Sequence, residues 1–312
     1  MLGLSVIAGA SAAACFGIAD FVVAGVSRVE GWRRTLLGAQ TMSLPILAVF
    51  AWAYGGWDLG IPEEHWGLLL GFGAAHLLGS VALYRGLEVG VVSVVSPLAG
   101  TFGAVTAILA VLLGAPMTTA LALALFSVVA GSMLAARSTV EAGSAKSNAR
   151  VEPLDSSTVG APWVRGAGWG LLSALALGVS FFGLDFLGGH GAPIALTVGS
   201  YRLLTALGLG ALSAMPGGAV DAGSTVGEAP GLWVSLGRWT LLGILDAGGM
   251  LVYAWGCARG EVAVVAVVAS LFPALTVSLA HWRMGERLSR WQWLGLGWMF
   301  AGLVAVASLQ GP

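Results

Sequence analysis

Charged side chains are scarce in this chain of 312 residues. Asp, Glu, Lys and Arg together make up 9% of it, whereas soluble domains carry about 25%. Hydrophobic residues account for 57%, and the mean hydropathy is +0.90. A soluble fold would leave much of that apolar surface in water, so the composition predicts a membrane protein with the lipid bilayer as a partner. The net charge of −1 shows no positive excess, and we expect no nucleic-acid partner.

Cysteine and the motifs of soluble enzymes are also rare or missing. Cys15 and Cys257 are the only cysteines, and both lie far apart in apolar stretches, which does not support a disulfide framework. The sequence contains no nucleotide-binding P-loop, no zinc-type cluster of His and Cys, and no nucleophile elbow. We therefore expect no cofactor, no ATP-driven step and no enzymatic activity.

Long apolar stretches dominate what remains. About 20 apolar residues cross a bilayer as a helix, because every backbone polar group must find its partner within the segment. The sequence predicts an all-α membrane protein with ten transmembrane helices. They are expected near residues 4–26, 35–55, 66–85, 91–113, 117–136, 166–188, 193–214, 238–258, 262–282 and 291–309.

The second half of the sequence repeats the first. Gly86–Ala110 and Gly256–Ala280 agree at eleven of 25 positions at an offset of 170. The match extends to Phe16 with Phe181 and to Asp20 with Asp185, both at an offset of 165. Two halves that each have an odd number of spans lie in the bilayer in opposite senses. We therefore predict two inverted five-helix repeats, 1–137 and 166–312, joined by a flexible polar linker at 138–165.

Basic residues predict the orientation, because Lys and Arg near span ends stay on the cytoplasmic side. Arg259 alone falls on the side of the even-numbered connections. Twelve others fall on the opposite side: Arg28, Arg33, Arg34, Arg85, Arg137, Lys146, Arg150, Arg165, Arg238, Arg283, Arg287 and Arg290. We expect a multi-pass protein of the cell (inner) membrane, with the linker in the cytoplasm and both termini outside.

Three stretches resemble EamA-type carriers of the drug/metabolite transporter superfamily: Cys15–Arg28, the run from Ser93, and above all Ser270–Ser308. The Gly-Glu-Arg sequence at Gly285–Arg287 is the most recognisable piece, and the first half has Gly114–Pro116 there instead. The resemblance implies a transporter fold and a solute-carrier role. It names no solute, since such carriers move amino acids, drugs, sugars and other metabolites.

Ionisable residues inside spans are candidate site residues, because each costs about 2.5–3.5 kcal/mol at the centre of a membrane helix. The repeat places His76 and Asp246 at equivalent depths of two helices. Both residues are expected to line a cavity, although His76 also fits a hydrogen-bonded core and the small residues around Asp246 also suit tight packing. Asp20 is a further candidate, with snorkelling or capping as the alternative.

Arg202 lies alone among the arginines in the interior of a span, at a depth similar to that of Asp185 on the preceding helix. The two side chains are predicted to form a structural ion pair. The alternative is that Arg202 binds a carboxylate or phosphate of the solute.

Four uncharged residues complete the set of candidate contacts to a solute. Tyr253 shares the helical stripe of Asp246, and Trp255 and Tyr201 can offer aromatic surface, although lone aromatic residues also suit a core. Gln40 aligns loosely with Tyr201. These patterns predict a secondary transporter, an exporter of a small organic metabolite or drug, that works by alternating access.

Coupling and assembly are open at this level. Uptake of a proton by Asp246, Asp20 or His76 would couple the solute to protons, and exchange without protons is the alternative. The chain can act as a monomer or a homodimer. The alternative function is a membrane-embedded enzyme acting on lipids or lipid-linked sugars.

Overall fold

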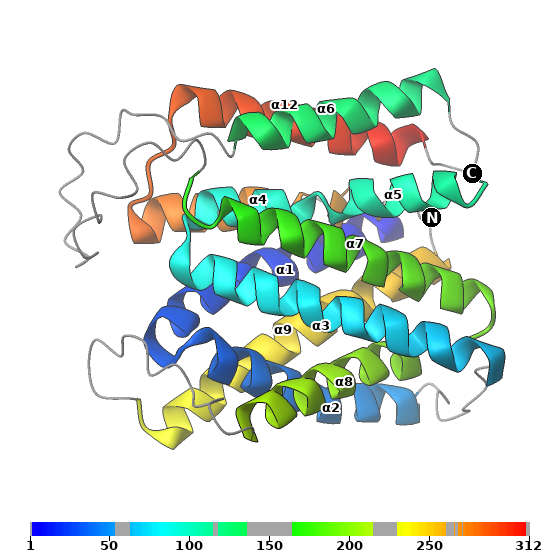
Figure 1. The fold of residues 1–312 in the computed structure, drawn as a ribbon, viewed down its shortest axis with the longest axis vertical. Coiled ribbons are helices and arrows are strands. Elements are labelled where there is room, and N and C mark those ends of the chain that lie inside the picture. The colour runs from blue at the N-terminus through cyan, green and yellow to red at the C-terminus, as the bar shows by residue number, and fades with distance from the viewer. Residues whose placement is uncertain are drawn as a thin grey trace.

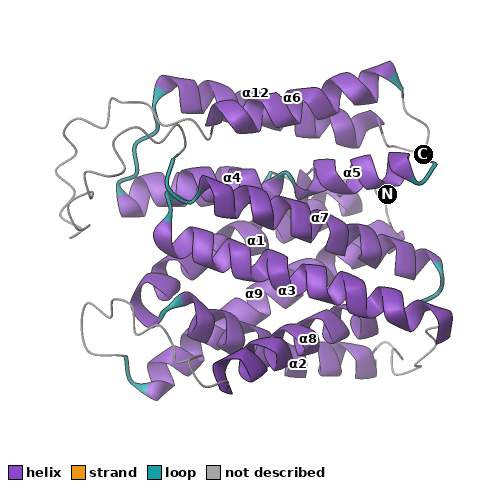
Figure 2. Cartoon of the chain, viewed as in Figure 1, coloured by secondary structure: helices purple, strands orange, loops and turns teal. Residues whose placement is uncertain are grey.

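The computed structural model describes residues 2–53, 63–114, 118–135, 164–214, 230–259, 265, 268–269 and 271–309. These residues form helices and short connections, and no strand occurs among them (Figure 2). The all-α prediction is therefore confirmed for this part of the chain. Residues 138–163 of the predicted linker lie outside the described residues.

The helices follow one another in the order expected from the sequence. The first half contains α1 (Leu2–Glu30), α2 (Trp32–Ala53), the short η1 (Glu63–His65), α3 (Trp66–Val89), α4 (Val92–Gly100), α5 (Phe102–Leu112) and α6 (Thr119–Ala135). The second contains α7 (Ala167–Gly189), α8 (Ile194–Ala214), α9 (Leu232–Arg259), α11 (Phe272–Leu279), the π-helical turn η3 (Ala280–Met284) and α12 (Arg290–Leu309).

Five helical segments of the described chain are long and apolar enough to cross a membrane. They are Val6–Glu30, Trp32–Ala53, Glu63–Val89, Ala167–Gly189 and Ile194–Ser213. A multi-pass membrane protein follows from these segments, whereas the layout of ten spans in two repeats stays a prediction.

The predicted span at 91–113 is two helices rather than one continuous helix. α4 ends and α5 begins around Thr101, whose backbone N–H bonds to the Leu98 carbonyl three residues earlier, 3.1 Å away. The Thr101 hydroxyl donates to the same carbonyl at 2.7 Å. The side chain thus competes for a backbone acceptor, which interrupts the regular helical ladder.

The helices pack in pairs that involve both halves. α1 lies on α9, and α3 lies on α7; α2 contacts α8, and α6 contacts α12. In Figure 1 the α6–α12 pair forms the top of the molecule, and α2 and α8 lie together at the bottom. α1 and α3 run from right to left in this view, and α7 and α9 run from left to right. The corresponding helices of the two halves therefore point in opposite directions.

Glycines set the distance between α6 and α12. A Cβ atom on Gly131 would lie 2.8 Å from the Gly295 carbonyl oxygen, and one on Gly295 would lie 2.8 Å from the Gly131 carbonyl oxygen. Because glycine lacks this atom, the two backbones approach closely, as is common between membrane helices.

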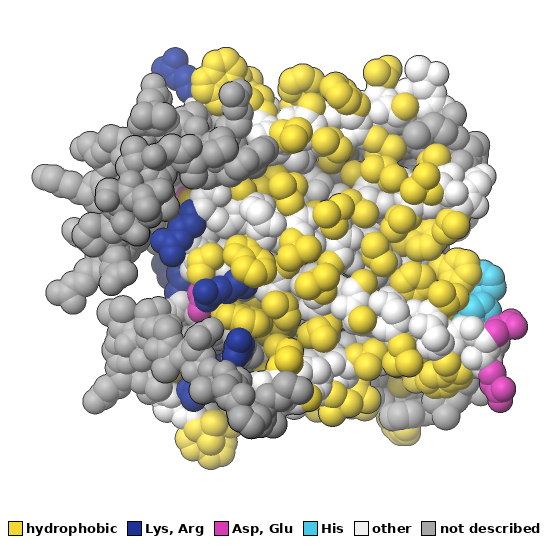
Figure 3. Space-filling model, viewed as in Figure 1, with side chains coloured by type: hydrophobic (Ala, Val, Ile, Leu, Met, Phe, Trp, Pro, Cys, Tyr) yellow, Lys and Arg dark blue, Asp and Glu magenta, His cyan; other side chains and the backbone are white. Residues whose placement is uncertain are grey.

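Basic side chains gather at one end of the molecule. Figure 3 shows Lys and Arg side chains at the left end of the visible face, whereas acidic and histidine side chains mark the right end of an apolar surface. At the left end α1, α3 and η3 finish and α9 begins. Three ion pairs join helices there or tie a helix end: Arg28 with Glu286, Arg85 with Glu88, and Arg238 with Glu30.

Glu286 joins the two halves at this basic end. Its carboxylate accepts the backbone N–H groups of Val92 and Ser93, at 3.0 and 2.8 Å, and the Ser93 hydroxyl at 2.7 Å. The acid of the Gly-Glu-Arg sequence therefore caps the N-terminus of α4, where a negative charge is favourable. Gly285 makes the turn before it, with a φ of 68° in the left-handed region that favours glycine.

Candidate functional site

A small cavity lies between helices of both halves. Its volume is about 80 Å³. Four ionisable side chains that the sequence singles out line it, namely Asp20 of α1, His76 of α3, Arg202 of α8 and Asp246 of α9. Drug-sized ligands occupy pockets of about 300–1,000 Å³. The cavity is thus too small for such a ligand in this conformation.

Arg202 forms its ion pair with Asp246, not with Asp185. Arg202 is 1% exposed, and one nitrogen of its guanidinium also donates to Gln40 Oε1 at 3.1 Å. A second nitrogen contacts the Met250 sulfur at 3.6 Å. The prediction of an Arg202–Asp185 pair is wrong because equal depth on consecutive helices does not fix which faces meet. Asp185 is exposed on α7, and Arg202 reaches from α8 to α9.

Asp20 faces the cavity from α1, where it is 7% exposed. Within the described residues its hydrogen-bond partner is the Ser96 hydroxyl of α4. The carboxylate lies inside the bundle, whereas snorkelling would carry it to the membrane surface. No positively charged side chain pairs with it among the described residues.

His76 is buried, and among the described residues only one of its ring nitrogens has a hydrogen-bond partner. Nδ1 lies 3.4 Å from the Ser180 hydroxyl, whereas Nε2 has no hydrogen-bond partner among the described residues. The ring stacks on Tyr201, with centroids 5.6 Å apart and planes at 28°. The Tyr201 hydroxyl donates to the Ser180 carbonyl at 3.5 Å. His76 is thus held in place from one side, and its second nitrogen remains for another partner.

Phenylalanines from both halves form a layer along one side of the cavity. The rings of Phe102 and Phe181 stack with centroids 4.4 Å apart. Phe272 lies 6.4 Å from Phe102 and 6.1 Å from Phe16. All four line the cavity. Phe16 matches Phe181 in the repeat, and Phe102 matches Phe272. The two middle rings of the row are therefore matching residues, and so are the two outer rings.

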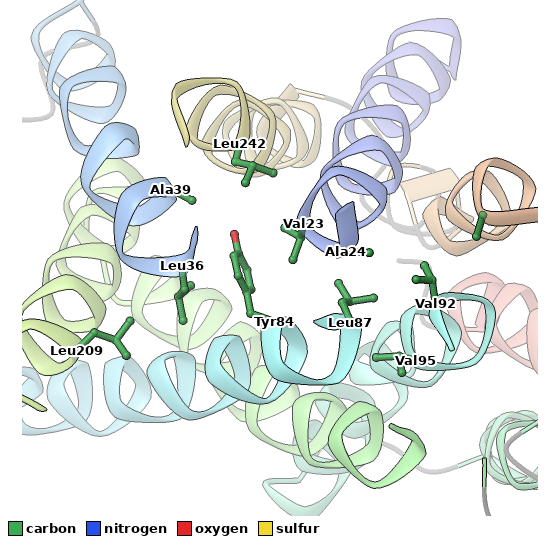
Figure 4. Close-up of a cluster of buried hydrophobic side chains, with 11 residues drawn as sticks. Val23, Ala24, Leu36, Ala39, Tyr84, Leu87, Val92, Val95, Leu209 and Leu242 are labelled. Carbon is green, nitrogen blue, oxygen red and sulfur yellow. The ribbon is translucent and has the colours of Figure 1, made fainter. Parts of the chain in front are cut away.

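Tyr84 is a lining residue that the sequence did not indicate. Its side chain, 4% exposed, projects from α3 into the space between Ala39 of α2, Val23 of α1 and Leu242 of α9 (Figure 4). Tyr84 lies two turns after His76 and one turn after Ser80, which also lines the cavity. Extending the stripe of His76 by one helical turn would have found it.

The remaining candidates divide into two groups. Gln40 and Tyr201 do not line the cavity but contact residues that do. Gln40 accepts a hydrogen bond from Arg202, and Tyr201 stacks on His76. Tyr253 and Trp255 are half-buried farther along α9 and do not line the cavity. Helical spacing places Tyr253 near the stripe of Asp246 but does not show how far along the helix the cavity extends.

A larger hollow of about 500 Å³ opens at the basic end between α1, α2 and α9. Glu30 and Arg34 are its charged lining residues, and Glu30 Oε1 accepts a hydrogen bond from Arg238 at 2.9 Å. The ionisable side chains from the helix interiors meet at the smaller cavity instead, and that cavity is the candidate site.

Comparisons with known proteins support the resemblance seen in the sequence. Residues 164–308 match the EamA-like transporter family, which confirms the predicted family over the second half of the chain. A solved structure titled "Crystal structure of protein" is similar to the whole fold, with a TM-score of 0.59 at 14% identity over 98% of this chain and 96% of that one. No curated protein matches the sequence.

Proposed function

We propose, from the place of residues 164–308 in the EamA-like transporter family, that this chain is a secondary transporter and that the cavity is its solute site. The solute is a small organic metabolite or drug. The observation that carries the proposal is the meeting of Asp20, His76, Arg202 and Asp246 in one buried cavity. Ionisable residues are costly inside a membrane, and they mark solute or ion pathways when they converge.

The packing of the helices supports alternating access. Contacts between the halves occur in equivalent pairs: α1 lies on α9 as α3 lies on α7, and α2 lies on α9 as α8 lies on α3. Inverted repeats with such reciprocal contacts can rock about a shared site and open it to either side in turn. The small volume of the cavity, about 80 Å³, then belongs to a closed conformation.

The basic end is the cytoplasmic end in this proposal. Arg28, Arg85 and Arg238 lie there, as the positive-inside rule requires of short cytoplasmic connections. The protein then spans the inner membrane with both termini outside, and export is the proposed direction of transport.

Proton coupling, where it occurs, falls to Asp20 or His76 rather than to Asp246. Asp246 already holds the guanidinium of Arg202, so a proton would have to displace a charged partner. Within the part of the chain that the structure describes, Asp20 has a neutral partner, Ser96, and one nitrogen of His76 has no hydrogen-bond partner. The family match does not support the alternative of a membrane-embedded enzyme.

Reconstitution into liposomes tests the proposal. We expect vesicles that contain the protein to exchange labelled organic metabolites faster than empty vesicles, and an imposed pH gradient to change the rate. The double variant Arg202→Gln/Asp246→Asn removes the ion pair without leaving a lone charge and is expected to slow the exchange. Exchange equal to that of empty vesicles for every solute in a broad metabolite mixture would contradict transport.

A further inference from the structure

We infer that the solute is a monovalent organic cation with a flat apolar or aromatic body, held by the Asp20 carboxylate beside the phenylalanine layer. This inference rests on the proposed transport function and specifies its solute class. The layer consists of Phe16, Phe102, Phe181 and Phe272.

The charges that line the cavity do not cancel. Arg202 and Asp246 neutralise each other in their ion pair. Asp20 is the third charged lining residue, and its partner among the described residues is a hydroxyl. When Asp20 is ionised and His76 is neutral, as most imidazole is above pH 7, the cavity carries one net negative charge. A buried carboxylate is stable beside a cation, so the missing partner is a positive charge.

The charges in the cavity disfavour an anionic solute. One terminal nitrogen of Arg202 contacts Asp246 and Gln40, and the other contacts the Met250 sulfur. The Nε atom has no hydrogen-bond partner among the described residues, so it offers a donor to a solute carboxylate. Such a carboxylate would be the third beside a single guanidinium, because Asp20 and Asp246 already line the cavity, and like charges repel.

The walls of the cavity suit the body of such a cation. Phe102 and Phe181 present stacked rings, and Phe16 and Phe272 extend the same surface. Aromatic faces attract cations and pack well against flat apolar groups. His76 Nε2, which has no partner among the described residues although the ring is buried, can take part in a hydrogen bond with the ammonium group.

A series of four compounds that share a phenylethyl body separates charge from shape. The compounds are 2-phenylethylammonium, zwitterionic L-phenylalanine, 3-phenylpropanoate and 2-phenylethanol. We would measure their binding to the purified wild-type protein by thermal shift and by competition. The ammonium compound is expected to bind roughly 10- to 100-fold more tightly than the alcohol, as for a charge-assisted hydrogen bond.

Asp20→Asn removes the charge and keeps the shape of the side chain. We expect it to weaken binding of the ammonium compound by roughly 10- to 100-fold and to leave the alcohol unaffected. Asp185→Asn is the matched control, because Asp185 occupies the equivalent position of the repeat but is exposed. If Asp20→Asn does not fold, the order of the four compounds on the wild-type protein still decides the matter.

The outcomes distinguish the inference from the transport function. Selective binding of the ammonium compound without flux into vesicles would keep the site and contradict transport. Flux of the zwitterion or the anion that survives Asp20→Asn would keep transport and overturn the inference. Equal binding of all four compounds, or binding of none at millimolar concentration, would also overturn it.

Discussion

Asp20 and Asp185 hold the same place in the two halves of the sequence but lie in different surroundings. Each follows a phenylalanine of the cavity layer by four residues, Phe16 and Phe181 respectively. Asp20 is 7% exposed and faces the cavity, whereas Asp185 is exposed on the surface. Equivalent positions in a repeat therefore do not guarantee equivalent roles.

The directions of α1 and α7 explain the difference. α1 runs toward the basic end of the molecule, and α7 runs away from it (Figure 1). Asp20, one turn after Phe16 on α1, therefore lies on the cavity side of the phenylalanine layer. Asp185, one turn after Phe181 on α7, lies on the opposite side. His76 and Asp246 lie in the central parts of α3 and α9, so both stay in the cavity. Residues at matching sequence positions therefore reach the same cavity from α3 and α9, whereas on α1 and α7 only Asp20 does.

The largest expected effect on stability comes from breaking the ion pair between Arg202 and Asp246, both in the second half of the chain. Arg202→Gln leaves the Asp246 carboxylate buried without its partner. Because a lone buried charge costs about 3–5 kcal/mol, we expect a large fall in thermal stability and yield. Fluorescence-detected size exclusion and a melting curve measure it. The double variant with Asp246→Asn should recover most of the loss; an equally unstable double variant would contradict the pairing.

The last helices of the two halves offer a second way to sharpen the comparison. A Cβ atom on Gly295 would lie 2.8 Å from the Gly131 carbonyl oxygen, whereas one on Gly297 meets nothing within 4 Å. We expect Gly295→Ala to destabilise the protein by about 1–3 kcal/mol, as overpacking does. Gly297→Ala, two residues along the same helix, should be neutral or slightly stabilising because alanine favours helix. Melting temperatures in one detergent compare the two; equal values would contradict the close approach.

Variants of Glu286 test a difference between the two halves at the basic end, namely the acid of the Gly-Glu-Arg sequence, which the first half lacks. The second half caps α4 of the first half through Glu286, whereas the first half has Ala115 and Pro116 in place of the acidic and basic residues of that sequence. Glu286→Ala removes a carboxylate that accepts two backbone N–H groups. We expect a loss of about 0.5–2 kcal/mol of stability, as for other helix caps. Glu286→Gln retains an acceptor and should lose less, and a melting series that ranks the two variants the other way would speak against capping.

The smallest expected change in stability comes from neutralising either of the two compared aspartates, Asp20 or Asp185. Asp20→Asn and Asp185→Asn should each shift stability by less than about 1 kcal/mol, because neither carboxylate has a charged partner among the described residues. Transport should separate them, since Asp20 alone lines the cavity. In vesicles with a pH gradient, the response of flux to pH is expected to persist in Asp185→Asn and to vanish in Asp20→Asn. An identical response in both variants would break the comparison.

Much of the candidate site was predictable because membrane helices leave few places for ionisable residues. Asp20, His76, Arg202 and Asp246 were all identified from the cost of burying them, and all four line one cavity. The pairing of Arg202 was not predictable. Helical spacing shows which residues share a face, but the neighbour that a face meets depends on how helices pack. For the same reason, the sequence indicated neither Tyr84 as a lining residue nor the contact between His76 and Ser180.

The sequence by itself determined that the chain enters a membrane as helices, because so apolar a composition cannot stay in water and a backbone in lipid must satisfy its own hydrogen bonds. The internal similarity of the sequence also predicts the repeat, and it aligns His76 with Asp246. The tertiary structure alone decided that Arg202 holds Asp246 and that Asp20, not Asp185, faces the cavity. The physical reason is that charge pairing and burial depend on distances between helices, which no spacing along one helix contains.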